Sequence, residues 1–147
     1  MQTAPLPVVA LTLGDPAGVG PELIARLLGQ TDATAHANIV LVGDAWLWAD
    51  GQKIAGVEVA TQPVRNFAEV RARADTRLPA WLPMDTVAAA QVVRGQAQAA
   101  GGASVRQVLN ACMDATQRGE VDAICFAPLN KFAMKQGGLR HEDELHH

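Results

Sequence analysis

The sequence of 147 residues lacks the features that define several protein classes. It has no segment rich in lysine and arginine and carries a formal net charge of -3, which excludes the basic surface that nucleic acids or anionic membranes require. No apolar stretch approaches the roughly eighteen residues of a membrane-spanning helix. The start, MQTAPLPVV, lacks the basic flank and long apolar segment of a signal peptide. We therefore expect a cytoplasmic protein without nucleic-acid or membrane partners.

Cysteine is also scarce, and its two positions form no recognised pattern. Cys112 and Cys125 are too few and too far apart for a zinc knuckle, a CxxC redox pair or a disulfide framework. We expect two buried thiols without a chemical role. With 49% apolar and 18% charged residues the composition is that of a globular chain, and the length suits one compact unit.

The first third of the chain alternates strand and helix patterns. Residues 8–13, VVALTL, are continuously apolar, which predicts a strand buried on both faces of a parallel sheet. A helix should begin near Gly20 and Pro21 and end at Gly29. Its expected apolar stripe consists of Leu23, Ile24, Leu27 and Leu28. Residues 38–44, NIVLVGD, predict a second strand that ends in a glycine and an acidic residue, with a short helix from Ala45.

The middle of the chain has a weaker pattern. Residues 57–60, VEVA, predict a strand, and residues 81–87, which include Pro83, predict an irregular or edge segment. The sequence AAGG at 99–102 predicts a break before the next helix.

The pattern is clear again after this break. A helix is expected over 103–117, with Gly119 as its stop. Its apolar face should consist of Val105, Val108, Leu109, Cys112 and Thr116. Residues 121–128, VDAICFAP, predict another buried strand, followed by a loop and a short helix that ends near Gly137.

These elements predict an α/β fold in which helices flank a mostly parallel sheet. Ligands of such folds gather at the carboxyl ends of strands, which directs attention to the loops 14–20 and 127–131. In the first loop, glycines at positions 14, 18 and 20 permit positive φ angles, and the start of the next helix favours an anion. However, the loop matches neither GxGxxG nor GxxxxGK[ST], and an unpaired Asp15 would repel phosphate. A plain tight turn is the alternative.

The second loop and the end of the chain carry further candidate groups. Asn130 and Lys131 follow a predicted strand and are suited to bind an oxyanion, although an exposed lysine in the first turn of a helix is the alternative. Residues 140–147, RHEDELHH, place three histidines and three acids together. This set suits a metal site, or else the exposed end of a chain.

Two segments together resemble one enzyme family. LTLGDPAGVGPELIARLL and GQAQAAGGASVRQVLNACMDATQRGEVDAICFAPLNKFAMKQGGL resemble the amino-terminal part of the 4-hydroxythreonine-4-phosphate dehydrogenase family. The likeness runs from about Val8 to Leu139 and is vague between residues 50 and 90. The first segment is also similar to the GDGIGPE loop of the isopropylmalate and isocitrate dehydrogenases, which share a related fold.

The resemblance implies an activity and a set of site residues. The implied reaction is NAD-dependent oxidation of a secondary alcohol on a small phosphorylated hydroxy acid, often with decarboxylation, assisted by a divalent metal. The implied enzyme is a homodimer with its site in a cleft between two α/β lobes. Gly14, Asp15, Gly18 and Gly20 would then form a loop at the cleft wall, and Asn130 and Lys131 would contact substrate.

The chain departs from the family in length and in its last residues. Family members are longer, and their metal-binding histidines lie in the part that follows this segment. Residues 1–147 are therefore expected to form a single α/β unit without the carboxy-terminal lobe and to be inactive alone, with metal ligands beyond residue 147. We assign no catalytic residue and no metal ligand within the chain.

Members of the family usually have a Gly-His-Thr-Glu stretch where this chain has RHEDELHH. Alignment on Glu144 places Glu142 and Asp143 at the substrate-binding positions, whereas a shift by one residue supplies His141. Two carboxylates at those positions would repel an anionic substrate and favour a different one. A non-catalytic α/β module that binds an anion or serves assembly is the alternative function.

Overall fold

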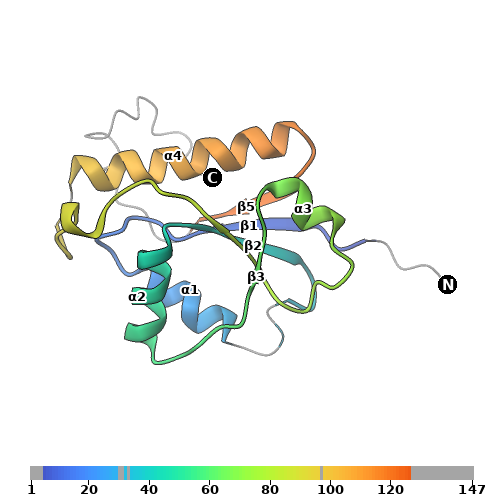
Figure 1. Ribbon diagram of the computed structural model, residues 1–147, viewed down its shortest axis with the longest axis horizontal. Helices are drawn as coiled ribbons and strands as arrows, with labels where there is room; N and C mark the ends of the chain where they lie inside the picture. Colours follow the sequence, from blue (N-terminus) through green and yellow to red (C-terminus); the bar gives the residue numbers. More distant parts are fainter. Residues whose placement is uncertain (1–4, 30–31, 33, 97, 127–147) are drawn as a thin grey trace.

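A parallel β-sheet with helices on both faces organises the computed structural model, which describes residues 5–29, 32, 34–96 and 98–126 (Figure 1). The five strands of this part lie in the order β3-β4-β2-β1-β5, and every neighbouring pair is parallel. The strands are β1 (Val8–Thr12), β2 (Asn38–Gly43), β3 (Gln62–Pro63), β4 (Ala80–Pro83) and β5 (Ala123–Cys125). The predicted α/β class with a parallel sheet is confirmed.

The helices divide between the two faces of the sheet. They are α1 (Gly20–Leu28), α2 (Ala45–Ala55), α3 (Phe67–Ala72), the short 3-10 helix η1 (Ala89–Gln91) and α4 (Ala99–Gln117). Helices α1 and α2 cover one face, and α3 and α4 cover the other (Figure 1). None of the described helices is both long enough and apolar enough to cross a membrane.

The two central strands are buried on both faces, as the continuous apolar runs predict. Val8 pairs with Asn38 and Thr12 with Val42, so β1 and β2 end at the same level. Their side chains alternate between two hydrophobic cores: Val40 and Val42 face α3 and α4, while Ile39 and Leu41 face α1 and α2. This register places the residues after β1 beside the residues after β2.

The apolar stripe predicted for α1 is partly wrong. Ile24 and Leu28 are buried, but Leu23 is 44% exposed and Leu27 is 43% exposed. The helix packs closely against α2 through its Pro21 side, which rotates Leu23 and Leu27 onto the flank turned away from α2. The residues that the prediction missed on the buried side are Gly20, Pro21 and Ala25.

The strand predicted at 57–60 is absent, and strand β3 follows it instead. Gly56 ends α2 in a left-handed conformation, and the Val59 N–H donates to the side chain of Gln52 rather than to a neighbouring strand. The prediction for 81–87 is also wrong at its start, because β4 lies inside the sheet between β2 and β3. Pro83 is tolerated there because it is the last residue of the strand, where Met84 supplies the next N–H to Gly43.

The break predicted at 99–102 is wrong as well, because α4 begins at Ala99 and contains both glycines. A Cβ atom at Gly101 would lie 3.1 Å from Asp15 Oδ1, so a residue without a side chain allows this first turn to pack on the opening loop. Along α4, Ala115 rather than Thr116 completes the buried face. Gly119, with φ of 77°, follows the end of α4 and confirms the predicted stop.

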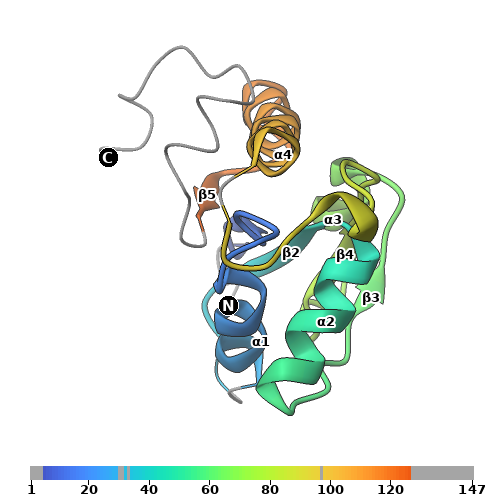
Figure 2. The same cartoon turned by 90° about the vertical axis from the view of Figure 1, so that its left-hand side faces the viewer.

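Strand β5 is more exposed than the buried strand predicted at 121–128. Ile124 packs against the core under α4, whereas Ala123 and Cys125 are exposed. Cys125 pairs with Leu11 and therefore lies on the α1 side of the sheet, but α1 sits beneath β1 and does not reach it (Figure 2). The two thiols thus differ, since Cys112 is fully buried and burial raises its pKa to about 12.

Candidate functional site

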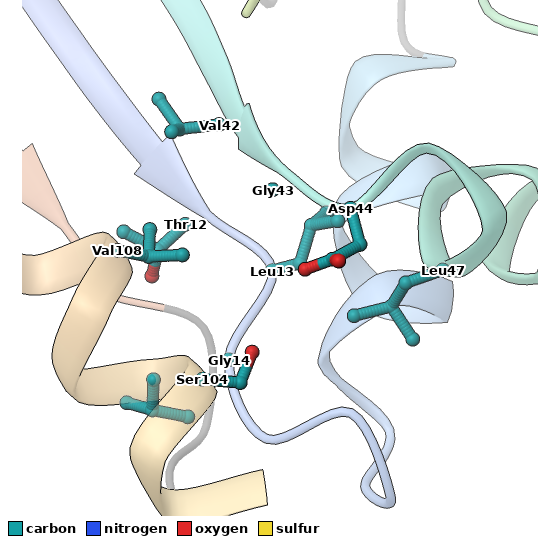
Figure 3. Close-up of a pocket in the computed structure, with 10 residues that line it drawn as sticks. Thr12, Leu13, Gly14, Val42, Gly43, Asp44, Leu47, Ser104 and Val108 are labelled. Carbon is teal, nitrogen blue, oxygen red and sulfur yellow. The ribbon is translucent and has the colours of Figure 1, made fainter. Parts of the chain in front are cut away.

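The carboxyl edge of the sheet brings together four segments that are distant in sequence. They are the loop after β1, Asp44 after β2 and the amino-terminal half of α4 (Figure 3), together with the segment after β4, which is hydrogen-bonded to Asp44 through Thr86. Parallel α/β sheets bind their ligands at this edge. The first predicted loop, residues 14–20, therefore lies where the sequence places it.

The opening loop is a tight turn closed by its own groups. The Asp15 side chain is 4% exposed, and its Oδ1 accepts a hydrogen bond of 2.8 Å from the Ala17 N–H. The Gly18 N–H donates to the Asp15 carbonyl at 3.0 Å. Of the three candidate glycines only Gly14 has a positive φ, 79°, so the expectation for Gly18 and Gly20 is wrong. The amide groups of Ala17 and Gly18 are occupied within the loop and are not directed at an anion.

The same loop is held down by the segment that leads into α4. The carbonyl of Ala17 accepts a hydrogen bond of 2.8 Å from the Gly95 N–H. Pro16 lies beneath Gly101, whose missing side chain permits the contact. Asp15, Pro16 and Ala17 are buried as a result. The geometry supports the plain-turn alternative: this loop is a closed turn at the carboxyl edge of the sheet.

A buried polar cluster centred on Asp44 joins three segments at this edge. Asp44 is 3% exposed, and its Oδ2 accepts hydrogen bonds from the backbone N–H groups of Thr86 at 2.8 Å and Val87 at 3.1 Å. The Thr86 hydroxyl lies 2.5 Å from Asp44 Oδ1 and 2.5 Å from Ser104 Oγ. The cluster thereby ties the end of β2 to the segment after β4 and to α4.

Sequence reasoning did not single out this cluster. For Asp44 a signal exists, because an acidic residue directly after a buried strand lies at the carboxyl edge of a parallel sheet. Thr86 and Ser104 belong to no motif, and only the folded chain brings them to Asp44.

A small pocket lies beside the cluster (Figure 3). Its lining consists of Thr12, Leu13, Gly14, Val42, Gly43, Asp44, Leu47, Ser104, Val105 and Val108. About 10 Å³ is open to the centre of a water molecule, which is the space that one water requires. The pocket is therefore too small for a nicotinamide ring or a phosphorylated substrate.

The remaining predicted site residues lie outside the described residues. These are Asn130, Lys131, His141, Glu142 and Asp143. Among the residues that are described, no three histidine, cysteine or acidic side chains are grouped so that they could hold a metal ion.

Comparison with known proteins gives the same family in sequence and in structure. Residues 35–147 match the sequence model of the family described as pyridoxal phosphate biosynthetic protein PdxA. A Pseudomonas aeruginosa protein, provisionally named 4-hydroxythreonine-4-phosphate dehydrogenase 2, is 39% identical over 147 residues, which cover 99% of this chain and 43% of the relative. D-threonate 4-phosphate dehydrogenase of Bordetella bronchiseptica is 37% identical over 97% of this chain and 41% of its own length.

The crystal structure of a 4-hydroxythreonine-4-phosphate dehydrogenase from Burkholderia phymatum superposes with a TM-score of 0.81 and 30% identity. The superposition covers 93% of this chain and 41% of that one. The chain spans about two fifths of the length of the curated relatives that it matches. Because the family model covers most of the sequence and the folds agree, the chain belongs to the PdxA family of pyridoxal phosphate biosynthetic proteins.

Proposed function

We propose that this chain is part of an NAD-dependent, metal-assisted dehydrogenase that oxidises a secondary alcohol on a small phosphorylated hydroxy acid, with or without decarboxylation. The observation that carries the proposal is the 39% identity to the Pseudomonas aeruginosa relative over 99% of this chain. The names of that protein and of the Bordetella bronchiseptica relative both specify a dehydrogenase and a 4-phosphate. A small phosphorylated hydroxy acid is therefore the substrate class to test first. We also propose a cytoplasmic location for the enzyme.

The described residues at the carboxyl edge fit neither NAD nor a metal ion by themselves. The pocket at the carboxyl edge has room for one water molecule, and the Ala17 and Gly18 amides are engaged within their own loop. No metal-binding group occurs among the residues with described positions. As the resemblance to the family implies, we place the metal ligands beyond residue 147, and we assign to the described part the shaping of one cleft wall.

We further propose that residues 1–147 form one α/β unit of a two-lobed enzyme that acts as a homodimer. The side of β5 that faces α1 supports this proposal, because Ala123 and Cys125 are exposed there. Leu23 and Leu27 lie on the free flank of α1. Parallel sheets are normally covered on both faces, so this apolar side is suited to contact with a second lobe.

Substrate binding is assigned to the segment after β5. Asn130 and Lys131 are proposed to contact the anionic groups of the substrate, as the resemblance implies. His141, or else Glu142 and Asp143, would occupy the next substrate-binding position. A pair of carboxylates there would repel a phosphate by several kcal/mol in a poorly hydrated cleft. The choice between these registers therefore decides whether the substrate is that of the named relatives.

The test uses the complete protein, extended to the length of its relatives. It is mixed with NAD, a divalent metal and a panel of phosphorylated four-carbon hydroxy acids and related diols, and formation of NADH is followed. Turnover that is lost on chelation of the metal is the expected result. Absence of NADH across the panel, from a protein that melts cooperatively, would count against the proposed activity.

Two lysine variants separate substrate contact from a general change of charge. Lys131→Ala should raise KM or lower kcat/KM, because an anion would lose its cationic partner. Lys53→Ala is the matched control, since Lys53 is an exposed residue in the last turn of α2. Equal kinetics for the two variants would remove Lys131 from the proposed site.

A further inference from the structure

The hydroxyl of Thr12 is a buried polar group that has no hydrogen-bond partner among the described residues. Thr12 is 3% exposed and ends β1, while Ser104 stands on the facing turn of α4 (Figure 3). Both residues line the small pocket at the carboxyl edge. A hydroxyl removed from water without a new partner is unfavourable, so its position at a pocket points to a ligand there.

In the Asp44 cluster, the donor and the acceptor of each hydrogen bond between side chains can be assigned. A carboxylate only accepts, so the Thr86 hydroxyl donates its single proton to Asp44 Oδ1. The Thr86 oxygen must then accept from Ser104, whose hydroxyl proton is thereby used. Toward the pocket, Ser104 Oγ retains only lone pairs and can accept a hydrogen bond from a donor there.

We propose that the pocket binds one water molecule, which accepts a hydrogen bond from Thr12 and donates one to Ser104 Oγ. The space of about 10 Å³ matches a single water, and the two hydroxyls supply the complementary donor and acceptor. The rest of the lining is largely apolar, including Val42, Leu47 and Val108, which disfavours a charged ligand.

The water completes a chain of hydrogen bonds from Thr12 through Ser104 and Thr86 to Asp44. This chain of hydrogen bonds links the end of β1 to α4, two residues before Gly14. It therefore positions the opening loop against the helix that covers it. The inference depends on the fold alone and is independent of the proposed dehydrogenase activity.

The direction of the Tm change on substitution of Thr12 tests the water site. Thr12→Val keeps the shape and removes the hydroxyl, so loss of the bound water should lower the Tm by roughly 3 °C. If the hydroxyl has no partner, the same substitution replaces an unsatisfied polar group by a methyl group and should raise the Tm. A raised or unchanged Tm overturns the proposal. Thr116→Val is the control, since this residue lies at an exposed position of α4 and its hydroxyl bonds only to the Cys112 carbonyl of its own helix, so the Tm should change less than in Thr12→Val.

A double-mutant cycle tests whether Thr12 and Ser104 share the water. Ser104→Ala should lower the Tm less in the Thr12→Val background than in the wild type, because the bridge is already broken. In the Thr12→Ser background, which keeps the hydroxyl, Ser104→Ala should have its full effect. Additive shifts in both backgrounds would overturn the bridge.

A crystal structure that shows ordered solvent provides the direct measurement. It should contain one water within hydrogen-bond distance of both Thr12 Oγ1 and Ser104 Oγ, and the Thr12→Val crystal should lack it. A dry pocket in the wild-type crystal would overturn the proposal whatever the variants do.

Discussion

The contact between α1 and α2 gives the sharpest prediction about stability. Gly51 lies in the middle of α2, where Gly→Ala ordinarily stabilises a helix by about 1 kcal/mol. Here a Cβ atom would lie 2.6 Å from the carbonyl carbon of Pro21, 2.6 Å from its Cβ and 2.7 Å from its carbonyl oxygen. Two of these are backbone atoms of α1, so relief requires the helices to separate. Overpacking of this kind destabilises by about 1–3 kcal/mol, and the upper end applies where backbone must move.

Gly51→Ala should therefore destabilise by about 1–2 kcal/mol after the gain in helix propensity is subtracted. That loss lowers the Tm by roughly 3 °C for each kcal/mol. The assay is urea unfolding followed by circular dichroism, with Gly29→Ala as the matched control. At Gly29 the φ angle is -72° and the nearest contact of a Cβ is 3.4 Å, so alanine should be neutral or slightly stabilising. A Gly51→Ala protein as stable as the wild type would refute the close helix contact.

Three further perturbations test other parts of the structure. In the folded 147-residue chain a thiol reagent should modify exposed Cys125 quickly and buried Cys112 only after unfolding. Slower modification of Cys125 in the complete protein would support a second lobe that covers it. An equal rate of Cys125 modification in the two proteins would oppose that lobe. A backbone N–H and a guanidinium hold the pKa of Asp122 below its usual value. This stabilisation exists above about pH 4 and is lost as the pH falls through the folded-state pKa, so the stability difference between the wild type and Asp122→Asn should shrink on acidification rather than stay constant. Gly14→Ala should destabilise by about 1–2 kcal/mol in thermal melts because φ is positive, whereas Gly18→Ala should not.

The elements that the sequence predicts well are those whose packing is decided locally. The strand at residues 8–13 and the strand at 38–44 are apolar over most of their length, so both faces must be covered whatever their neighbours are. The stop at Gly119 follows from its positive φ after the end of α4, whereas Gly29 ends α1 with a φ of -72° that other residues also adopt. Such features need no knowledge of the partner that each segment meets.

The errors occur where a distant contact determines the outcome. The glycines at 101 and 102 look like a break, but the approach of Asp15 to α4 makes glycine useful inside the helix. Pro83 resembles an edge signal, but it occupies the final residue of an interior strand. Leu23 and Leu27 fit a helical stripe, yet the position of α2 turns them outward. None of these contacts is encoded in the neighbouring residues.

The candidate site likewise has one part that the sequence predicts and one part that it does not. The sequence locates the opening loop at the carboxyl edge, because it follows a buried strand. It does not locate the Asp44 cluster, whose three side chains come from positions 44, 86 and 104 and meet only after β2, β4 and α4 have packed. Polar groups without a shared motif are found from the folded chain alone.

The polar groups at the carboxyl edge have a consequence for specificity. The carboxylates of Asp15 and Asp44 are buried, and their hydrogen bonds join segments of this chain to one another. They fix geometry and leave few groups to recognise a substrate, so we expect substrate preference to reside after β5. A chimera that joins residues 1–126 to the corresponding remainder of the Pseudomonas aeruginosa relative should oxidise the substrate of that relative with its preference intact. A preference that instead follows residues 1–126 would show that this edge selects the substrate and does more than frame the cleft.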